Sequence, residues 1–205
     1  MTEPQEALER LRAGNARFVA NESSLNIGNI ERAAQTSGQA PFAAILGCSD
    51  SRVPTEVVFD QGLGDLFVIR VAGNIVAPSQ IGSIEFATQK FGTKLVIVLG
   101  HTHCGAVEAT IDELQQPAEK QSRNIAAIVS RIRPSVMDLL ERDNAMDRDE
   151  LIHKAVRANV RFSAQALRHG SEIIKELIGA GELLIVGAEY SLDTGIVEFF
   201  DGTAN

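Results

Sequence analysis

The 205-residue sequence lacks several features that would each assign it to a class of protein. It has only two cysteines, which cannot form a disulfide framework, and its charged N-terminus lacks the apolar core of a signal peptide. No apolar run is long enough to cross a membrane. Its net charge of −8 provides no basic surface for nucleic acid. These absences predict a cytoplasmic protein that binds neither membranes nor nucleic acids.

The chain also shows no internal repeat, low-complexity tract or linker that would divide it. Its length suits one domain with a buried core, so we expect residues 1–205 to form a single domain. Residues 1–38 are expected to form an N-terminal helical arm, with a helix at 2–20 and a short helical stretch within 22–38.

Four apolar runs have the length and composition of strands that are buried on both faces. They lie at 42–47, 66–73, 94–100 and 182–190, and helical patterns lie at 79–92, about 121–141, 147–169 and 171–178. Strands that alternate with helices predict an α/β fold with a mainly parallel sheet flanked by helices.

The C-terminal segment predicts a turn at 193–195 followed by an antiparallel edge strand. Phe199 and Phe200 are adjacent on that strand, so their side chains point to opposite faces. Such a strand is covered either by a partner subunit or by the first helix of its own chain.

The two cysteines stand near the ends of two predicted strands. Cys48 follows the run at 42–47, while His101 follows the run at 94–100 and precedes Cys104 by three residues. Because the carboxyl ends of parallel strands line one edge of a sheet, we expect these segments to meet there. His101 and Cys104 share a face if a helical turn begins at Thr102.

Two thiolates and an imidazole suit tetrahedral Zn²⁺, and three firm ligands with a replaceable fourth are typical of a catalytic zinc. Asp50 is an optional fourth ligand. Three alternatives stay open at this point. His103 could replace His101, although it would approach the metal with strain because it adjoins Cys104. The cysteines could be inert buried residues. They could also form a redox disulfide, which would leave Asp50 and Arg52 unexplained.

Three motifs resemble those of the β-class carbonic anhydrases in order and spacing: CSDSR at 48–52, RVAGN at 70–74 and GHTHCGA at 100–106. The resemblance runs from about residue 39 to residue 107. It implies reversible hydration of CO₂ to bicarbonate, with hydrolysis of carbonyl sulfide or carbon disulfide as the alternative on the same site. It also implies a homodimer or larger homo-oligomer in which the N-terminal helix reaches across a partner.

The resemblance implies zinc ligands at Cys48, His101 and Cys104, and a catalytic pair at Asp50 and Arg52. A guanidinium two residues away can hold the Asp50 carboxylate off the metal. A zinc-binding scaffold protein without catalytic activity is the alternative from a different functional class. The intact Asp50–Arg52 pair argues against it.

Substrate-binding positions are implied at Gln39, Phe67 and Ala72. Gln39 likewise argues against a scaffold. Gly105 removes a side chain where backbone N–H groups could face a small oxyanion.

Two expectations concern regulation and pH. Members that bicarbonate switches off carry a tryptophan three residues before the first zinc cysteine, where this chain has Ile45 and no tryptophan anywhere. The resemblance therefore implies a constitutively open site, although Arg70 and Tyr190 align with other parts of that regulatory pocket. Two thiolates cancel the charge of Zn²⁺, so the pKa of its water should exceed the value of about 7 found with three histidines, and activity should rise with pH.

Overall fold

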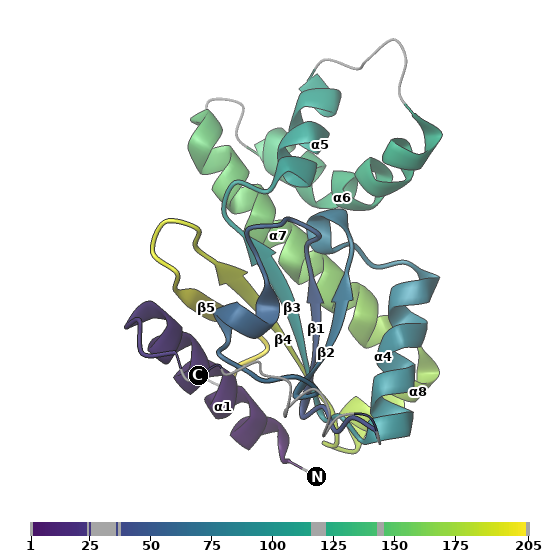
Figure 1. The fold of residues 1–205 in the computed structure, drawn as a ribbon. Coiled ribbons are helices and arrows are strands. Elements are labelled where there is room, and N and C mark those ends of the chain that lie inside the picture. The colour runs from purple at the N-terminus through teal and green to yellow at the C-terminus, as the bar shows by residue number, and fades with distance from the viewer. Residues whose placement is uncertain are drawn as a thin grey trace.

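The computed structural model describes residues 2–23, 25, 36, 38–115, 122–142 and 146–203. A five-stranded sheet of order β2-β1-β3-β4-β5 forms its centre (Figure 1). The strands are β1 (Ala43–Gly47), β2 (Leu66–Arg70), β3 (Leu95–His101), β4 (Leu184–Tyr190) and β5 (Val197–Asp201). The first four pair in parallel and β5 pairs antiparallel to β4, which confirms the predicted α/β class and its antiparallel edge strand.

Helices cover both faces of the sheet and its carboxyl edge. They are α1 (Pro4–Val19), α3 (Thr55–Val58), α4 (Pro78–Phe91), α5 (Gly105–Gln115), α6 (Arg123–Arg142), α7 (Arg148–His169) and α8 (Glu172–Gly179). In Figure 1, α1 lies on one side of the sheet, α7 and α4 on the other, and α5 and α6 above the strand ends. None of the described helices has both the length and the apolarity needed to span a membrane.

The ends of α1, α4, α6, α7 and α8 lie within about two residues of the expected positions, whereas the sequence analysis did not predict α3 and α5. Asp147 caps α7 by accepting a hydrogen bond from the Asp149 amide, and Gly92 ends α4 at a φ of 66°. The sequence suggests Ser79 as the N-cap of α4, but Ala77 is the N-cap and Ser79 lies inside the helix, because proline at 78 is well suited to the first helical position. The run at 66–73 is strand only to residue 70 and continues as a 3₁₀ turn (Ala72–Asn74). The helical stretch expected within 22–38 falls largely outside the described residues.

The core consists of three apolar clusters, and alternation along β1 divides the first two. Ala43 and Ile45 face the cluster under α1, whereas Ala44 and Leu46 face the cluster under α4, α7 and α8. The third cluster lies among α5, α6 and the first half of α7, and it contains both cysteines. The packing therefore buries the cysteines between the carboxyl edge of the sheet and the helices above it.

Helix α1 packs against the sheet of its own chain. Leu8 and Leu11 are 2% and 0% exposed in the cluster under this helix. The Asn15 amide nitrogen donates to the carbonyls of Val58 and Gly195 at 3.1 and 2.9 Å, and its oxygen accepts from the Val197 amide at 2.8 Å. The apolar stripe of α1 is therefore buried on its own sheet, and a contact of this helix with a partner subunit stays a prediction.

The edge strand β5 is also covered within the chain. The Phe199 ring lies 6.3 Å from that of Phe59, and the Arg157 guanidinium lies 3.9 Å from the centre of the Phe200 ring. The first helix takes part in this cover, because the Arg12 guanidinium lies 5.2 Å from the centre of the Phe199 ring. Additional cover by a partner subunit stays a prediction.

Candidate metal centre

The two cysteine segments meet at the carboxyl edge of the sheet. Strands β1 and β3 are neighbours, although the chain passes through edge strand β2 between them. Cys48 comes directly after β1 and His101 is the last residue of β3, so the order of strands itself brings them together. The potential ligand atoms of Cys48, His101 and Cys104 all lie within 4.8 Å of one another, and all three residues are buried.

A tight turn, rather than a helical turn from Thr102, brings Cys104 back toward His101. The Thr102 amide continues the sheet by donating to the Tyr190 carbonyl at 3.0 Å, and the next residue, His103, has a φ of 54°. Helix α5 starts only at Gly105. Because sheet pairing continues to Thr102, helix α5 begins later than a helical turn from Thr102 would. The chain reverses direction between them through His103, which adopts a left-handed backbone conformation.

The environment of His101 leaves one ring nitrogen available for a metal. Its Nδ1 lies 2.9 Å from the Thr102 carbonyl oxygen, an arrangement that places the ring proton on Nδ1. Its Nε2 is buried and has no hydrogen-bond partner in the described part of the chain. Because an unpaired buried acceptor is unfavourable, the position of this nitrogen near two sulfurs fits a metal ligand. The side chain of the alternative ligand, His103, is 60% exposed.

The two thiols interact directly. A hydrogen bond from Cys104 lowers the pKa of Cys48 against the opposing effect of burial, and amide groups of Gly73 and Asp50 contribute further. The same hydrogen bond, together with burial, raises the pKa of Cys104. The raised pKa of Cys104 favours its protonated form, so a divalent cation that binds both sulfurs would have to displace this proton.

Asp50 and Arg52 form a two-pronged ion pair beside this cluster. Arg52 Nε and Nη2 donate to the two carboxylate oxygens at 2.9 and 2.7 Å, and Nη2 also donates to the His103 carbonyl at 3.1 Å. Asp50 Oδ2 lies 3.9 Å from His101 Nε2. The hydrogen bond from Arg52 holds the pKa of Asp50 well below its usual range, so the carboxylate is ionised next to the Cys48-His101-Cys104 cluster.

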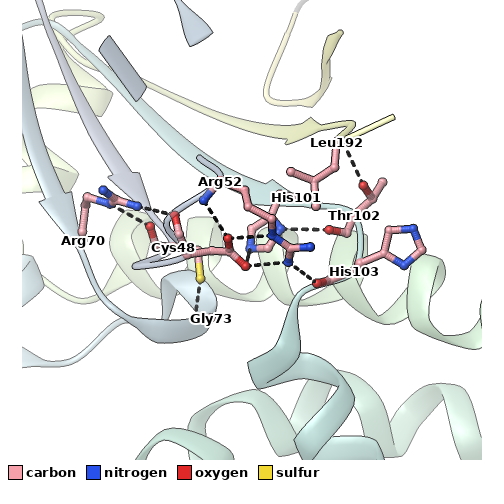
Figure 2. A network of polar contacts seen from close by, with 9 residues as sticks. Cys48, Arg52, Arg70, Gly73, His101, Thr102, His103 and Leu192 are labelled. Atoms are coloured by element: carbon pink, nitrogen blue, oxygen red, sulfur yellow. Dashed lines mark hydrogen bonds and ion pairs between the residues drawn. The ribbon is translucent and has the colours of Figure 1, made fainter. Parts of the chain in front are cut away.

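Arg70 fixes the backbone that carries these groups, a contact that the sequence did not predict. Its Nε donates to the Cys48 carbonyl at 2.9 Å and its Nη2 to the Asp50 carbonyl at 2.5 Å (Figure 2). The resemblance aligned Arg70 with part of a regulatory bicarbonate pocket, whereas here its guanidinium binds the loop that carries Cys48 and Asp50. Tyr190, the other residue aligned with that pocket, is 6% exposed.

The structure separates the four residues predicted to bind substrate into two pairs. Ala72 opens the turn that contacts Cys48, and Gly105 adjoins Cys104 with open space where a side chain would be. Phe67 pairs with Ala44 near the amino end of β2, about 13 Å along the strand direction from the cysteine. Gln39 is exposed and precedes the amino end of β1. Their roles stay predictions.

Comparison with known proteins assigns the family. The family model for carbonic anhydrases matches residues 43–197. Carbonic anhydrase 2 of Mycobacterium tuberculosis is 38% identical over 205 residues, covering 100% of this chain and 96% of the relative. A carbonic anhydrase of Mycolicibacterium smegmatis is 40% identical over 196 residues, covering 95% and 92%.

Solved structures agree with this assignment. A β-carbonic anhydrase of Aspergillus fumigatus superposes with a TM-score of 0.75 at 26% identity, covering 94% of this chain and 90% of the other. A tetrameric β-carbonic anhydrase of Sordaria macrospora, with a TM-score of 0.77 at 23% identity and coverage of 94% and 96%, supports the fold alone. With its motifs, its fold and its Cys-His-Cys cluster in agreement, the chain belongs to the β-class carbonic anhydrases, which are enzymes of the carbonate dehydratase type.

Proposed function

We propose that this protein catalyses the zinc-dependent, reversible hydration of CO₂ to bicarbonate and a proton. The observation that carries the proposal is the buried Cys48-His101-Cys104 cluster, whose ligand atoms lie within 4.8 Å of one another beside an ionised carboxylate. Family membership supports the same activity.

The donor set suits zinc. Two sulfurs and one imidazole nitrogen match the ligands that Zn²⁺ prefers, and His101 Nε2, which has no hydrogen-bond partner among the described residues, would supply the nitrogen. Cys48, His101 and Cys104 would hold the ion. When bound, zinc supplies Lewis acidity that lowers the pKa of a water molecule and so generates the nucleophile for CO₂.

Asp50 would orient that nucleophile. An ionised carboxylate only accepts hydrogen bonds, so Asp50 can align a water molecule near the metal ligands without donating to it. Arg52 binds both carboxylate oxygens, and this grip would keep the carboxylate from becoming a fourth ligand. Arg70 would contribute by holding the carbonyls on either side of residue 49 in place.

The decisive experiment is stopped-flow CO₂ hydration by the zinc-loaded protein over a series from neutral to alkaline pH. We expect fast hydration that rises with pH, and a large loss of rate in Asp50→Asn at unchanged zinc content. Metal-free protein is the matched control. A protein with one zinc per chain and no hydration would contradict the proposal, and carbonyl sulfide and carbon disulfide would then be tested as substrates.

We also propose that the protein forms a homodimer or a larger homo-oligomer. The outer edge of β2 pairs with no other strand in the described ranges, and the nearby Phe86 is 52% exposed although its ring contacts Phe67 and Phe91. An apolar edge of this kind favours pairing with another chain. Phe67 lies far from Cys48 along its own sheet. If Phe67 lines a substrate pocket, as predicted, it would therefore be the pocket of the partner subunit, which it would reach across such an interface.

Sedimentation velocity tests the assembly. Phe86→Asp should shift the protein toward the monomer, because it places a charge in the apolar contact. Phe162→Asp, at a position on α7 that is 41% exposed, is the matched control and should leave the assembly intact. Equal behaviour of the two variants would place the interface elsewhere.

A further inference from the structure

The backbone of Gly73 contacts the Cys48-His101-Cys104 cluster. Its N–H donates to Cys48 Sγ at 3.3 Å (Figure 2), and its φ of 68° lies in the left-handed region. A Cβ on this residue would lie 2.7 Å from Ile132 Cδ1 and 3.1 Å from Ala106 Cβ. Only glycine fits this position without displacing its neighbours. Glycine has many alternative backbone conformations, however, so this one must be held from outside.

Asn159 on α7 provides that restraint. Its Nδ2 donates to the Gly73 carbonyl at 2.8 Å, across a sequence separation of 86 residues. Asn159 is 1% exposed, so the contact lies in the interior. Hydrogen bonds therefore fix Gly73 on both sides. The sulfur of Cys48 accepts from its N–H, and the side-chain amide of Asn159 donates to its carbonyl.

The Asn159 amide is only partly paired. Asn159 Oδ1 is buried without a hydrogen-bond partner within the described ranges. Leaving such an atom unpaired costs about 1–3 kcal/mol, and an apolar residue of the same shape would instead leave the Gly73 carbonyl unpaired. The gain that offsets this cost is the hydrogen bond to Gly73, whose other end contacts a metal ligand.

We infer that Asn159 is a positioning residue for the metal centre: it orients Gly73 so that the Gly73 N–H donates to the sulfur of Cys48. The inference rests on the metal site proposed above. A hydrogen bond to a thiolate withdraws electron density from the sulfur, so it limits how much charge Cys48 transfers to a bound metal ion. Partners of this kind, one step removed from the metal, orient ligands and tune the metal in other sites.

The test removes the amide. Asn159→Leu keeps the branched shape of the side chain, and Asn159→Ala removes the donor without adding bulk, in case leucine prevents folding. Ser163→Ala is the matched control, because Ser163 is 2% exposed one turn further along α7. Each protein is loaded with Co²⁺, and the sulfur-to-metal charge-transfer band and the dissociation constant for Co²⁺ are measured. No CO₂ is needed.

In both Asn159 variants we expect the charge-transfer band to move to lower energy, since an electron leaves the sulfur more easily without the hydrogen bond. Affinity should fall 10–100-fold, the usual effect of losing such a partner. Ser163→Ala should change neither. An unshifted band in Asn159→Ala would overturn the inference, even if stability fell. A wild-type protein without any thiolate band would instead overturn the proposed metal site.

Discussion

Replacing Gly73 with alanine should destabilise the folded protein by an amount that follows from the local geometry. The left-handed conformation costs a residue with a Cβ about 1–2 kcal/mol. The new methyl group would also lie 2.7 Å from Ile132 Cδ1, and overpacking of this kind costs about 1–3 kcal/mol. The sum is about 2–5 kcal/mol, which lowers the melting temperature of a protein of this length by roughly 4–20 °C.

The two contributions separate in a double-mutant cycle. Ile132→Val removes the methyl group that would clash, so the combination of Gly73→Ala with Ile132→Val should recover the overpacking part but not the backbone part. Urea unfolding of all four proteins measures the coupling. Gly82→Ala in α4 is the control, since a Cβ there meets open space and alanine favours a helix.

Zinc affinity is the second measurement on the same variants. The shift that relieves the clash moves the Gly73 N–H away from Cys48, so Gly73→Ala should also weaken zinc binding. If Gly73→Ala had both the stability and the zinc affinity of the wild type, the reasoning about this turn would be refuted.

Three further predictions follow from the site and from α1. Arg52→Ala should abolish CO₂ hydration while zinc stays bound, because nothing then holds the Asp50 carboxylate away from the metal site beside His101. Arg52→Lys should restore only part of the rate. Zinc loss in Arg52→Ala, measured by elemental analysis, would contradict the restraining role of Arg52. Zinc affinity should rise with pH, because the raised pKa of Cys104 keeps a proton on this thiol that zinc must displace. Competition with a chelator measures the affinity, and an affinity that did not change between about pH 6 and about pH 8 would contradict this prediction. Asn15→Leu should cost about 2–4 kcal/mol in urea unfolding, since it leaves backbone groups at three contacts unpaired, while Co²⁺ binding stays unchanged.

The sequence predicted the parts of this protein that depend on local pattern. Runs of β-branched and aliphatic residues such as 94–100 are strands because only a sheet buried on both faces accommodates them, and the structure confirms each within a few residues. The meeting of Cys48 and His101 followed from the same pattern, since both stand where parallel strands end at one edge.

Tertiary structure decided what depends on the direction of individual side chains. The sequence implied His101 rather than His103 as the ligand, but the turn that brings Cys104 back toward His101 contains a left-handed residue that the spacing does not reveal. Arg70 holds the loop that carries Cys48 and Asp50, because edge strand β2 ends beside β1 in space.

The same holds for contacts between distant parts of the chain. Asn159 reaches Gly73 across 86 residues, and α1 lies on its own sheet through Asn15, which contacts residue 195. Local pattern sets which segments are strands and helices, and so it determines the fold class and the edge where the site forms. Which side chains touch there depends on how the helices pack against that edge, and periodicity carries no information about a hydrogen bond between two elements.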